Sequence, residues 1–145
     1  MRCCCAIPRR PRWSNFGDWT ENADGQQTTV KGLSITGIGA QHAVILPTIP
    51  RIGNVGVLVT AAGEPTLFHP GDTYEHAPSD VDVLALPLSA PWAKSSETVD
   101  FIHRVSPRTL FPIHDCTTSP AGHGSYSGSS RRSRWRRRRP AARPD

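Results

Sequence analysis

The sequence predicts an α/β domain in which one helix packs on a sheet of short strands. Apolar and polar residues alternate across "TTVKGLSITGIG" (28–39), the pattern of a half-buried hairpin. The nearly continuous apolar run "VDVLALPL" (81–88) is typical of a strand buried on both faces. The segment "SSETVDFIHRV" (95–105) places apolar side chains at helical spacing. Strands followed by one strand–helix–strand unit indicate a layered fold.

The remaining elements follow from local signals. "NVGVLVT" (54–60) and "TLFH" (66–69) form a second predicted strand pair, joined by the turn sequence "AAGEP". Ser95 or Ser96 is the predicted N-cap of the helix, and Pro107 ends it. "RTLFPIH" (108–114) is the last predicted strand.

Charge is distributed unevenly along the 145 residues. Residues 131–145 hold eight of the 17 basic residues, whereas residues 23–130 hold five basic and nine acidic ones. We therefore expect three regions: a low-order segment (1–27), the folded domain (28–126) and a disordered Arg-rich tail (127–145). The sequence pI of about 9.5 describes the ends of the chain and not the domain.

Several protein classes are disfavoured by simple absences in the sequence. The start "MRCCCAIPRRPRW" lacks the apolar region of a secretory signal, and no apolar run reaches the length of a transmembrane helix. No CxxC pair is present, which argues against a zinc ribbon or a thioredoxin-like motif. The expectation is a cytoplasmic protein without a transmembrane segment.

Three residues of metal-ligand type follow predicted strands. His42 follows the first hairpin, Asp72 lies in the turn "HPGDT" and His114 follows the last strand. Loops at strand ends are frequent positions for functional side chains, and imidazole and carboxylate are suitable ligands for zinc or iron. Taken singly, each residue is as readily explained by a local hydrogen bond or by its turn.

Five segments together resemble the second half of a metallo-β-lactamase-fold hydrolase. They are "GIGAQHAVILPTIPRIGNVGVLV", "TLFHPGDT", "VDVLALPLSAPW", "ETVDFI" and "PRTLFPIHD". The similar branch includes ribonuclease Z-like and ascorbate-phosphate-lactonase-like members. The resemblance implies a partial αββα sandwich with disordered basic ends.

The resemblance also implies roles for single residues. His42 matches a ligand of the first metal, Asp72 the carboxylate that bridges two metals, and His114 a ligand of the second metal. His69 and Asp115 match positions beside the ligands, where His69 could orient Asp72 and Asp115 could orient His114 or begin a turn. The cofactor implied is zinc, in a two-metal site, and no residue is assigned a catalytic role.

This sequence departs from the family pattern at one motif. Family members carry an HxHxDH motif upstream that supplies four further ligands, and this chain has no histidine before His42. Each metal then has two protein ligands, where catalytic zinc usually has three and a water. The expectation is a truncated or frame-shifted member, with weak metal binding and impaired or no hydrolysis.

Two further hypotheses concern partners. The arginines of residues 131–145, with Trp135 available for stacking, could bind nucleic acid or an anionic surface. Alternatively, a homodimer or a complementing partner could supply the sheet that the resemblance implies is missing.

Overall fold

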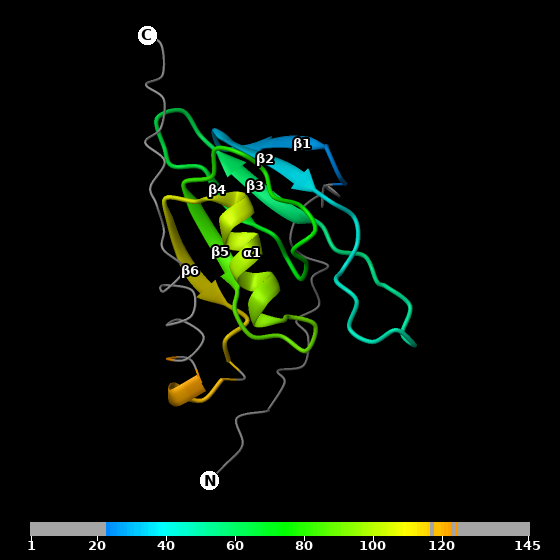
Figure 1. The fold of residues 1–145 in the computed structure, drawn as a ribbon. Helices are drawn as coiled ribbons and strands as arrows, with labels where there is room; N and C mark the ends of the chain where they lie inside the picture. Colours follow the sequence, from blue (N-terminus) through cyan, green and yellow to red (C-terminus); the bar gives the residue numbers. More distant parts are fainter. Residues whose placement is uncertain (1–22, 117, 123, 125–145) are drawn as a thin grey trace, which may run out of the picture.

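A computed structural model describes residues 23–116, 118–122 and 124 of the chain. The low-order segment predicted for residues 1–27 lies largely outside these residues, and the whole of the Arg-rich tail predicted for residues 127–145 lies outside them. Within the described part, six strands form one mixed sheet in the order β1-β2-β3-β4-β5-β6, and one long helix packs on it (Figure 1).

The first four strands form the antiparallel part of the sheet. They are β1 (Gln27–Val30), β2 (Leu33–Ile38), β3 (Gly56–Thr60) and β4 (Leu67–His69). Both hairpins lie where the alternating sequence predicts them. The β1–β2 turn uses two residues with positive φ, Lys31 at 49° and Gly32 at 83°. Positive φ at both central positions matches the right-handed twist of the strands that the turn joins.

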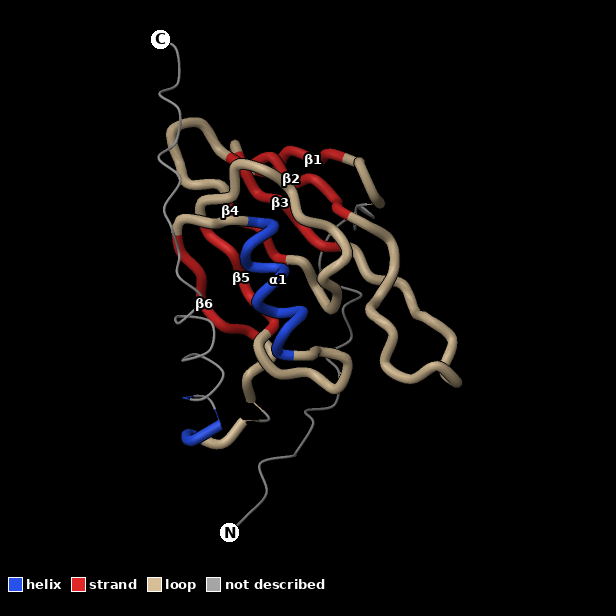
Figure 2. The backbone as a smooth tube through the Cα atoms, in the orientation of Figure 1, coloured by secondary structure: helices blue, strands red, loops and turns tan. Residues whose placement is uncertain are grey.

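The last strands form a parallel unit around the helix. β4 pairs in parallel with β5 (Val83–Pro87), which pairs in parallel with β6 (Thr109–Ile113). α1 (Ser95–Val105) connects β5 to β6 and lies across the sheet (Figure 2). The predicted strand–helix–strand unit is therefore present, with the helix over the predicted residues.

The start of α1 differs from the sequence prediction. Lys94, not Ser95 or Ser96, is the N-cap, and it makes no side-chain cap hydrogen bond. Thr98 instead bonds back to the Lys94 carbonyl, with its backbone N–H at 2.9 Å and its hydroxyl at 3.2 Å. Ser106 ends the helix in a left-handed conformation, immediately before the predicted stop at Pro107.

The core lies between α1 and one face of the sheet. Strand register aligns Leu58, Phe68, Leu84 and Leu110 on this face. Phe101 and Ile102 of the helix are fully buried against them. This cluster is the main source of apolar burial in the described residues. The prediction that 81–88 forms a strand buried on both faces is confirmed over most of β5, because Leu84, Ala85, Leu86 and Pro87 are all buried.

The opposite face of the sheet is also apolar. Ile35, Val59, Leu67 and Val83 form a row across four strands there, with the side chains only partly buried. Phe111 on the same face is 45% exposed. No described helix covers this face. It is the face against which the second layer of the predicted sandwich would pack.

A long loop connects β2 to β3 and extends away from the sheet (Figure 2). The loop exposes large apolar side chains, namely those of Val44, Ile45, Leu46, Ile49, Ile52 and Val55. Backbone bonds close its base, from His42 N–H to the Ile52 carbonyl at 2.9 Å and from Asn54 N–H to the Ala40 carbonyl at 3.1 Å. The loop thus begins and ends at a fixed edge of the sheet.

Candidate metal centre

The three predicted ligands meet at one edge of the sheet. β2, β4, β5 and β6 all run in the same direction, so their carboxyl ends share this edge. His42 follows β2, Asp72 follows β4 and His114 follows β6. The carboxyl ends of strands are where α/β sheets usually present binding sites. We call this edge the metal edge.

The Asp72 carboxylate lies between two imidazoles. Its Oδ1 is 2.8 Å from His114 Nε2, and its Oδ2 is 3.6 Å from His42 Nε2. The Asp72 side chain is 36% exposed, the His114 side chain 40% and the His42 side chain 9%. One oxygen therefore faces each histidine, in a position that solvent can reach.

The hydrogen bonds of His42 determine its tautomer. Its Nδ1 lies 2.6 Å from the Ala43 carbonyl, and a carbonyl can only accept, so Nδ1 carries the proton. In the neutral ring, Nε2 then has a lone pair directed at an anionic oxygen. Two acceptors facing each other at 3.6 Å suit a metal ion between them. An Nδ1–H to carbonyl bond is also the usual support for a metal-binding imidazole.

His114 is held differently. Its Nε2 lies 2.8 Å from Asp72 Oδ1, closer than His42 Nε2 lies to Asp72 Oδ2. Its backbone adopts φ of 58°, a left-handed conformation that is uncommon outside glycine. Such backbone strain is often found at functional sites.

The donor set fits a metal in type but not in number. Two imidazole nitrogens and a carboxylate match the ligands of zinc. However, the described residues contain no group of three or more His, Cys, Asp or Glu side chains placed to hold one ion. The carboxylate separates the two imidazoles, so each position between them has one imidazole and one carboxylate oxygen.

The two predicted supporting residues lie close to the ligands in sequence. The Gly71 N–H donates to His69 Nδ1 at 3.0 Å, within the turn that carries Asp72. The Asp115 carbonyl accepts from the Thr118 N–H at 3.0 Å, so a turn begins at this residue. Of the other histidines, His103 is exposed on α1, and the His76 ring packs on Gly39.

Asn54 is a member of the site that sequence reasoning missed. Its amide side chain bonds to the backbone on both sides of Gly71, in the Asp72 turn. The residue is separated from that turn by a strand and a loop, and a single Asn before a strand carries no distinctive signal. Only the pairing of β3 with β4 brings the two together.

Polar contacts also anchor the segment after Asp72. Arg51 donates through Nε to the His42 carbonyl at 2.7 Å and through Nη2 to Glu75 Oε2 at 2.8 Å. The hydrogen bond and charge of Arg51 lower the pKa of Glu75. The buried Tyr74 hydroxyl donates to the Pro87 carbonyl and lies 3.0 Å from Thr98 Oγ1. Burial raises the pKa of Tyr74, which keeps the phenol neutral.

A ring cluster forms the wall behind His42. Trp92 contacts His42 edge-on, with ring centroids 6.0 Å apart, and contacts Tyr74 at 4.8 Å. Trp92 comes from the connection between β5 and α1. The aromatic wall limits the access of water to His42 from that side and holds its ring in place.

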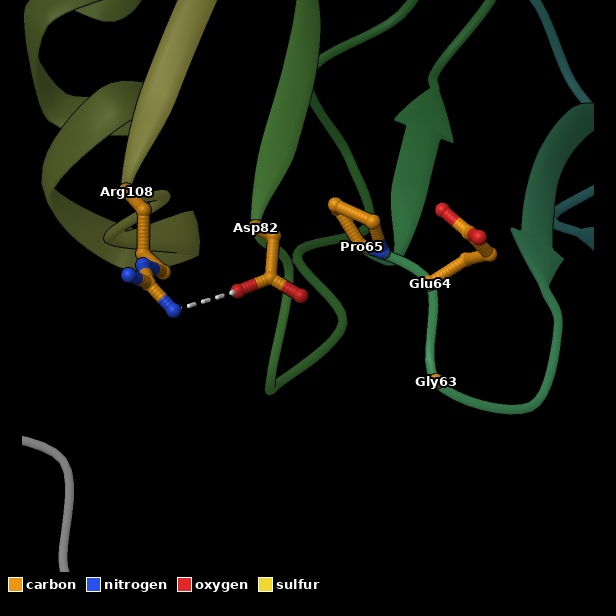
Figure 3. A pocket seen from close by; sticks show the side chains of 5 residues that line it. All are labelled: Gly63, Glu64, Pro65, Asp82 and Arg108. Carbon is orange, nitrogen blue, oxygen red and sulfur yellow. Dashed lines mark ion pairs between the residues drawn. The ribbon is translucent and has the colours of Figure 1, made fainter.

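An open pocket of about 520 Å³ lies at the other edge of the sheet. It is lined by Gly63, Glu64, Pro65, Asp82 and Arg108, at the turn after β3 and the starts of β5 and β6 (Figure 3). Asp82 is already paired with Arg108 at 3.6 Å and accepts from the Thr66 N–H at 2.9 Å. The pocket therefore lies at the opposite ends of the strands from the three predicted ligands and does not include them.

The chain is similar in sequence and in structure to known proteins. The profile of a family described as beta-lactamase superfamily domain matches residues 16–114. Protein Rv0786c of Mycobacterium tuberculosis is 39% identical over 111 residues, which are 76% of this chain and 52% of that protein. A crystal structure from Parabacteroides distasonis, of a protein provisionally described as a metal-dependent hydrolase, matches with a TM-score of 0.63 and 20% identity.

The last match covers 83% of this chain and 57% of the other, and at that identity it shows the fold alone. The chain thus spans about half the length of the relatives that it matches. No described helix is long and apolar enough to cross a membrane.

Proposed function

Because the chain belongs to the beta-lactamase superfamily domain family, we propose that it is a metal-dependent hydrolase-type domain carrying the second part of a two-metal centre. The observation that supports this most directly is the Asp72 carboxylate, which presents one oxygen to His42 and the other to His114. That arrangement suits a carboxylate that bridges two ions.

We assign His42 and Asp72 to one ion and Asp72 and His114 to the other. Nitrogen and oxygen donors in this combination suit zinc. A bound zinc ion supplies an activated water and polarises a carbonyl or phosphoryl group. The chain's own residues hold the carboxylate between the imidazoles, and Trp92 screens His42 from water. His69 and Asp115 are proposed to support the ligands from the adjoining turns.

The chain alone is proposed to hydrolyse weakly or not at all. Each ion would receive two protein ligands from the described residues, where catalytic zinc usually has three. No HxHxDH motif occurs in the sequence to supply more.

Calorimetric titration of zinc or manganese into the purified chain tests the proposal. We expect weak binding that is abolished in Asp72→Ala and retained in Asp100→Ala, which removes an exposed carboxylate from α1 as a matched control. The same samples should show little turnover of esters, lactones or phosphodiesters. Binding that is unchanged in Asp72→Ala refutes the assigned ligands. Vigorous metal-dependent turnover that stops in Asp72→Ala refutes the impaired activity.

We also propose a complementing partner for the open face of the sheet. The row of apolar side chains on that face and the exposed Phe111 favour a covering layer. The longer relatives have chain to supply one, beyond the part that matches. The proposed occupant is a polypeptide equivalent to that unmatched part.

Light scattering after size exclusion tests the partner. The chain is mixed with the part of Protein Rv0786c outside the matched region, and a one-to-one complex is expected. Phe111→Ser should weaken it, whereas His103→Ser on the helix should not, because His103 lies on the covered side of the sheet. Two separate monomers contradict the proposal, and a homodimer of the chain alone identifies a second copy as the occupant instead.

A further inference from the structure

We propose that Asn54 is a positioning residue that fixes the direction of the Asp72 carboxylate at the metal edge. The inference rests on the proposed function, because it concerns a ligand of the same centre. It begins from the two hydrogen bonds of one side chain, which connect the end of the long loop to the Asp72 turn.

The Asn54 amide bonds to that turn with both of its polar atoms. Nδ2 donates to the Pro70 carbonyl at 3.0 Å, and Oδ1 accepts from the Asp72 N–H at 2.8 Å. A carbonyl only accepts and a backbone N–H only donates, so a flipped amide would lose both bonds. The orientation of the side chain is therefore fixed by the chemistry of its partners.

The turn is shaped around this amide. Gly71 lies between the two bonded groups and has φ of 68°. A Cβ at Gly71 would lie 2.2 Å from Asn54 Oδ1, well inside van der Waals contact. Glycine is thus required at this position by its conformation and by the closeness of Asn54. Asn54 and Gly71 form a matched pair from distant parts of the sequence.

The backbone of Asp72 is held from both sides. Its N–H bonds to Asn54, and its carbonyl accepts from the Ala43 N–H at 2.9 Å. Ala43 directly follows His42, and the Asn54 N–H closes the same loop by bonding to Ala40. Asn54 therefore connects the segment that carries His42 with the turn that carries Asp72.

None of these bonds uses the Asp72 carboxylate. Its direction is set through the backbone alone, which leaves one oxygen for each imidazole. Without the Asn54 amide, the Asp72 N–H would lose its acceptor and the Pro70 carbonyl its donor. The turn would then be free to rotate the carboxylate away from the 3.6 Å and 2.8 Å contacts with the histidines. Outer-shell partners of this type typically contribute about 10–100-fold to metal affinity.

Two substitutions separate positioning from a general contribution to folding. Asn54→Ala removes both bonds to the turn. Asn54→Asp keeps an oxygen that accepts from the Asp72 N–H, while its second oxygen replaces the donor and faces the Pro70 carbonyl as another acceptor. Zinc titration of the folded variants should show a loss of about 10–100-fold in affinity for Asn54→Ala, with most of the affinity kept in Asn54→Asp. Asp82→Ala is the matched control, since it removes a side-chain acceptor for a backbone N–H at the opposite edge.

A second measurement needs no metal. The carbon-bound ring proton at Cε1 of His114 does not exchange with water, and its proton NMR resonance should be shifted by the Asp72 carboxylate 2.8 Å from Nε2. We expect this shifted resonance in the wild type and in Asn54→Asp, and its loss in Asn54→Ala. His114→Ala identifies it.

The outcomes distinguish this inference from the proposed function. A wild type that binds no zinc, but loses the His114 resonance in Asn54→Ala, refutes the metal centre and supports the role of Asn54. Equal zinc affinity in the wild type and Asn54→Ala overturns the role of Asn54 and leaves the centre intact. An equal loss in Asn54→Ala and Asn54→Asp also overturns it, because the Asp72 N–H would not be the group through which Asn54 acts.

Discussion

The two edges of the sheet each carry an aspartate in a turn before or after a strand, and they use it in opposite ways. At the edge with the pocket, the Asp82 carboxylate bonds to the Thr66 N–H and pairs with Arg108 (Figure 3). At the metal edge, the backbone of Asp72 is bonded and its carboxylate faces only the two imidazoles.

The difference separates a structural carboxylate from one that is available for binding. Asp82 holds the starts of β5 and β6 together with its own charge, so its oxygens are already used. Asp72 is held through its backbone, so that its two oxygens face the imidazoles at the metal edge. Burial does not distinguish the two, since the side chains are 23% and 36% exposed. Their hydrogen bonds distinguish them, because the Asp82 carboxylate accepts from a backbone N–H, whereas Asp72 is bonded through its own backbone N–H.

The largest effect that tests the comparison is expected from Asp72→Ala. Metal affinity should fall by more than the roughly 10–100-fold that an outer-shell partner contributes, because the bridging carboxylate itself is lost. The free energy of unfolding should change by less than about 0.5 kcal/mol, since the hydrogen bonds of Asp72 within the described residues involve its backbone and not its carboxylate. Zinc calorimetry and urea unfolding measure the two quantities. A large loss of stability would mean that the Asp72 carboxylate has a structural role, as the Asp82 carboxylate does.

Asp82→Ala should show the reverse pattern. Removing a partly buried, charged acceptor leaves the Thr66 N–H without its partner and should cost about 1.5–3 kcal/mol of unfolding free energy. Zinc affinity, measured on the folded variant, should be unchanged because the residue lies at the other edge of the sheet. If zinc binding weakened as much as in Asp72→Ala, the two edges would not be independent.

The contrast between Asp72 and Asp82 also shows how far the sequence can be interpreted alone. Alternation in residues 28–39 and the apolar run at 81–88 were sufficient for the hairpin and the buried strand, because both patterns report burial directly. The helix followed from its spacing. Its cap did not, because Lys94 has no capping side chain and the first turn is closed by Thr98 instead.

At the site, the types of ligand could be predicted from the sequence, but the residues that hold the ligands in place could not. His42, Asp72 and His114 follow strands that a parallel unit brings to one edge, so their approach could be expected from topology. Asn54 lies close to Gly71, which is distant in the sequence, and no local sequence pattern predicts that contact. The tautomer of His42 likewise follows only from its contact with the Ala43 carbonyl, which the sequence does not reveal.

Tyr74→Phe tests how the metal edge is anchored to the core. Burial raises the pKa of Tyr74 above 10.0, so the folded state favours the neutral phenol. The stability associated with it is complete below the unfolded pKa and is lost as pH rises through the folded one. The variant should lose about 0.5–1.5 kcal/mol at neutral pH, through the missing bond to Pro87. Urea unfolding should also show a shallower alkaline decline than the wild type, and equal declines would contradict the anchor.

The smallest effect is expected at the exposed Arg51–Glu75 pair beside the metal edge. Arg51 lowers the pKa of Glu75 below 4.5, so the pair stabilises the fold above that pH and this contribution disappears as pH falls through the folded pKa. Glu75→Gln should therefore reduce the acid-dependent fall of the melting temperature only slightly, because solvent screens the pair. Glu64→Gln, at the pocket edge, is the matched control. Arg51 also donates to the His42 carbonyl, and Glu75→Gln keeps this bond. Zinc affinity should therefore be unchanged in Glu75→Gln. A loss of affinity would mean that the ion pair, and not the bond to His42, holds the His42 segment in place.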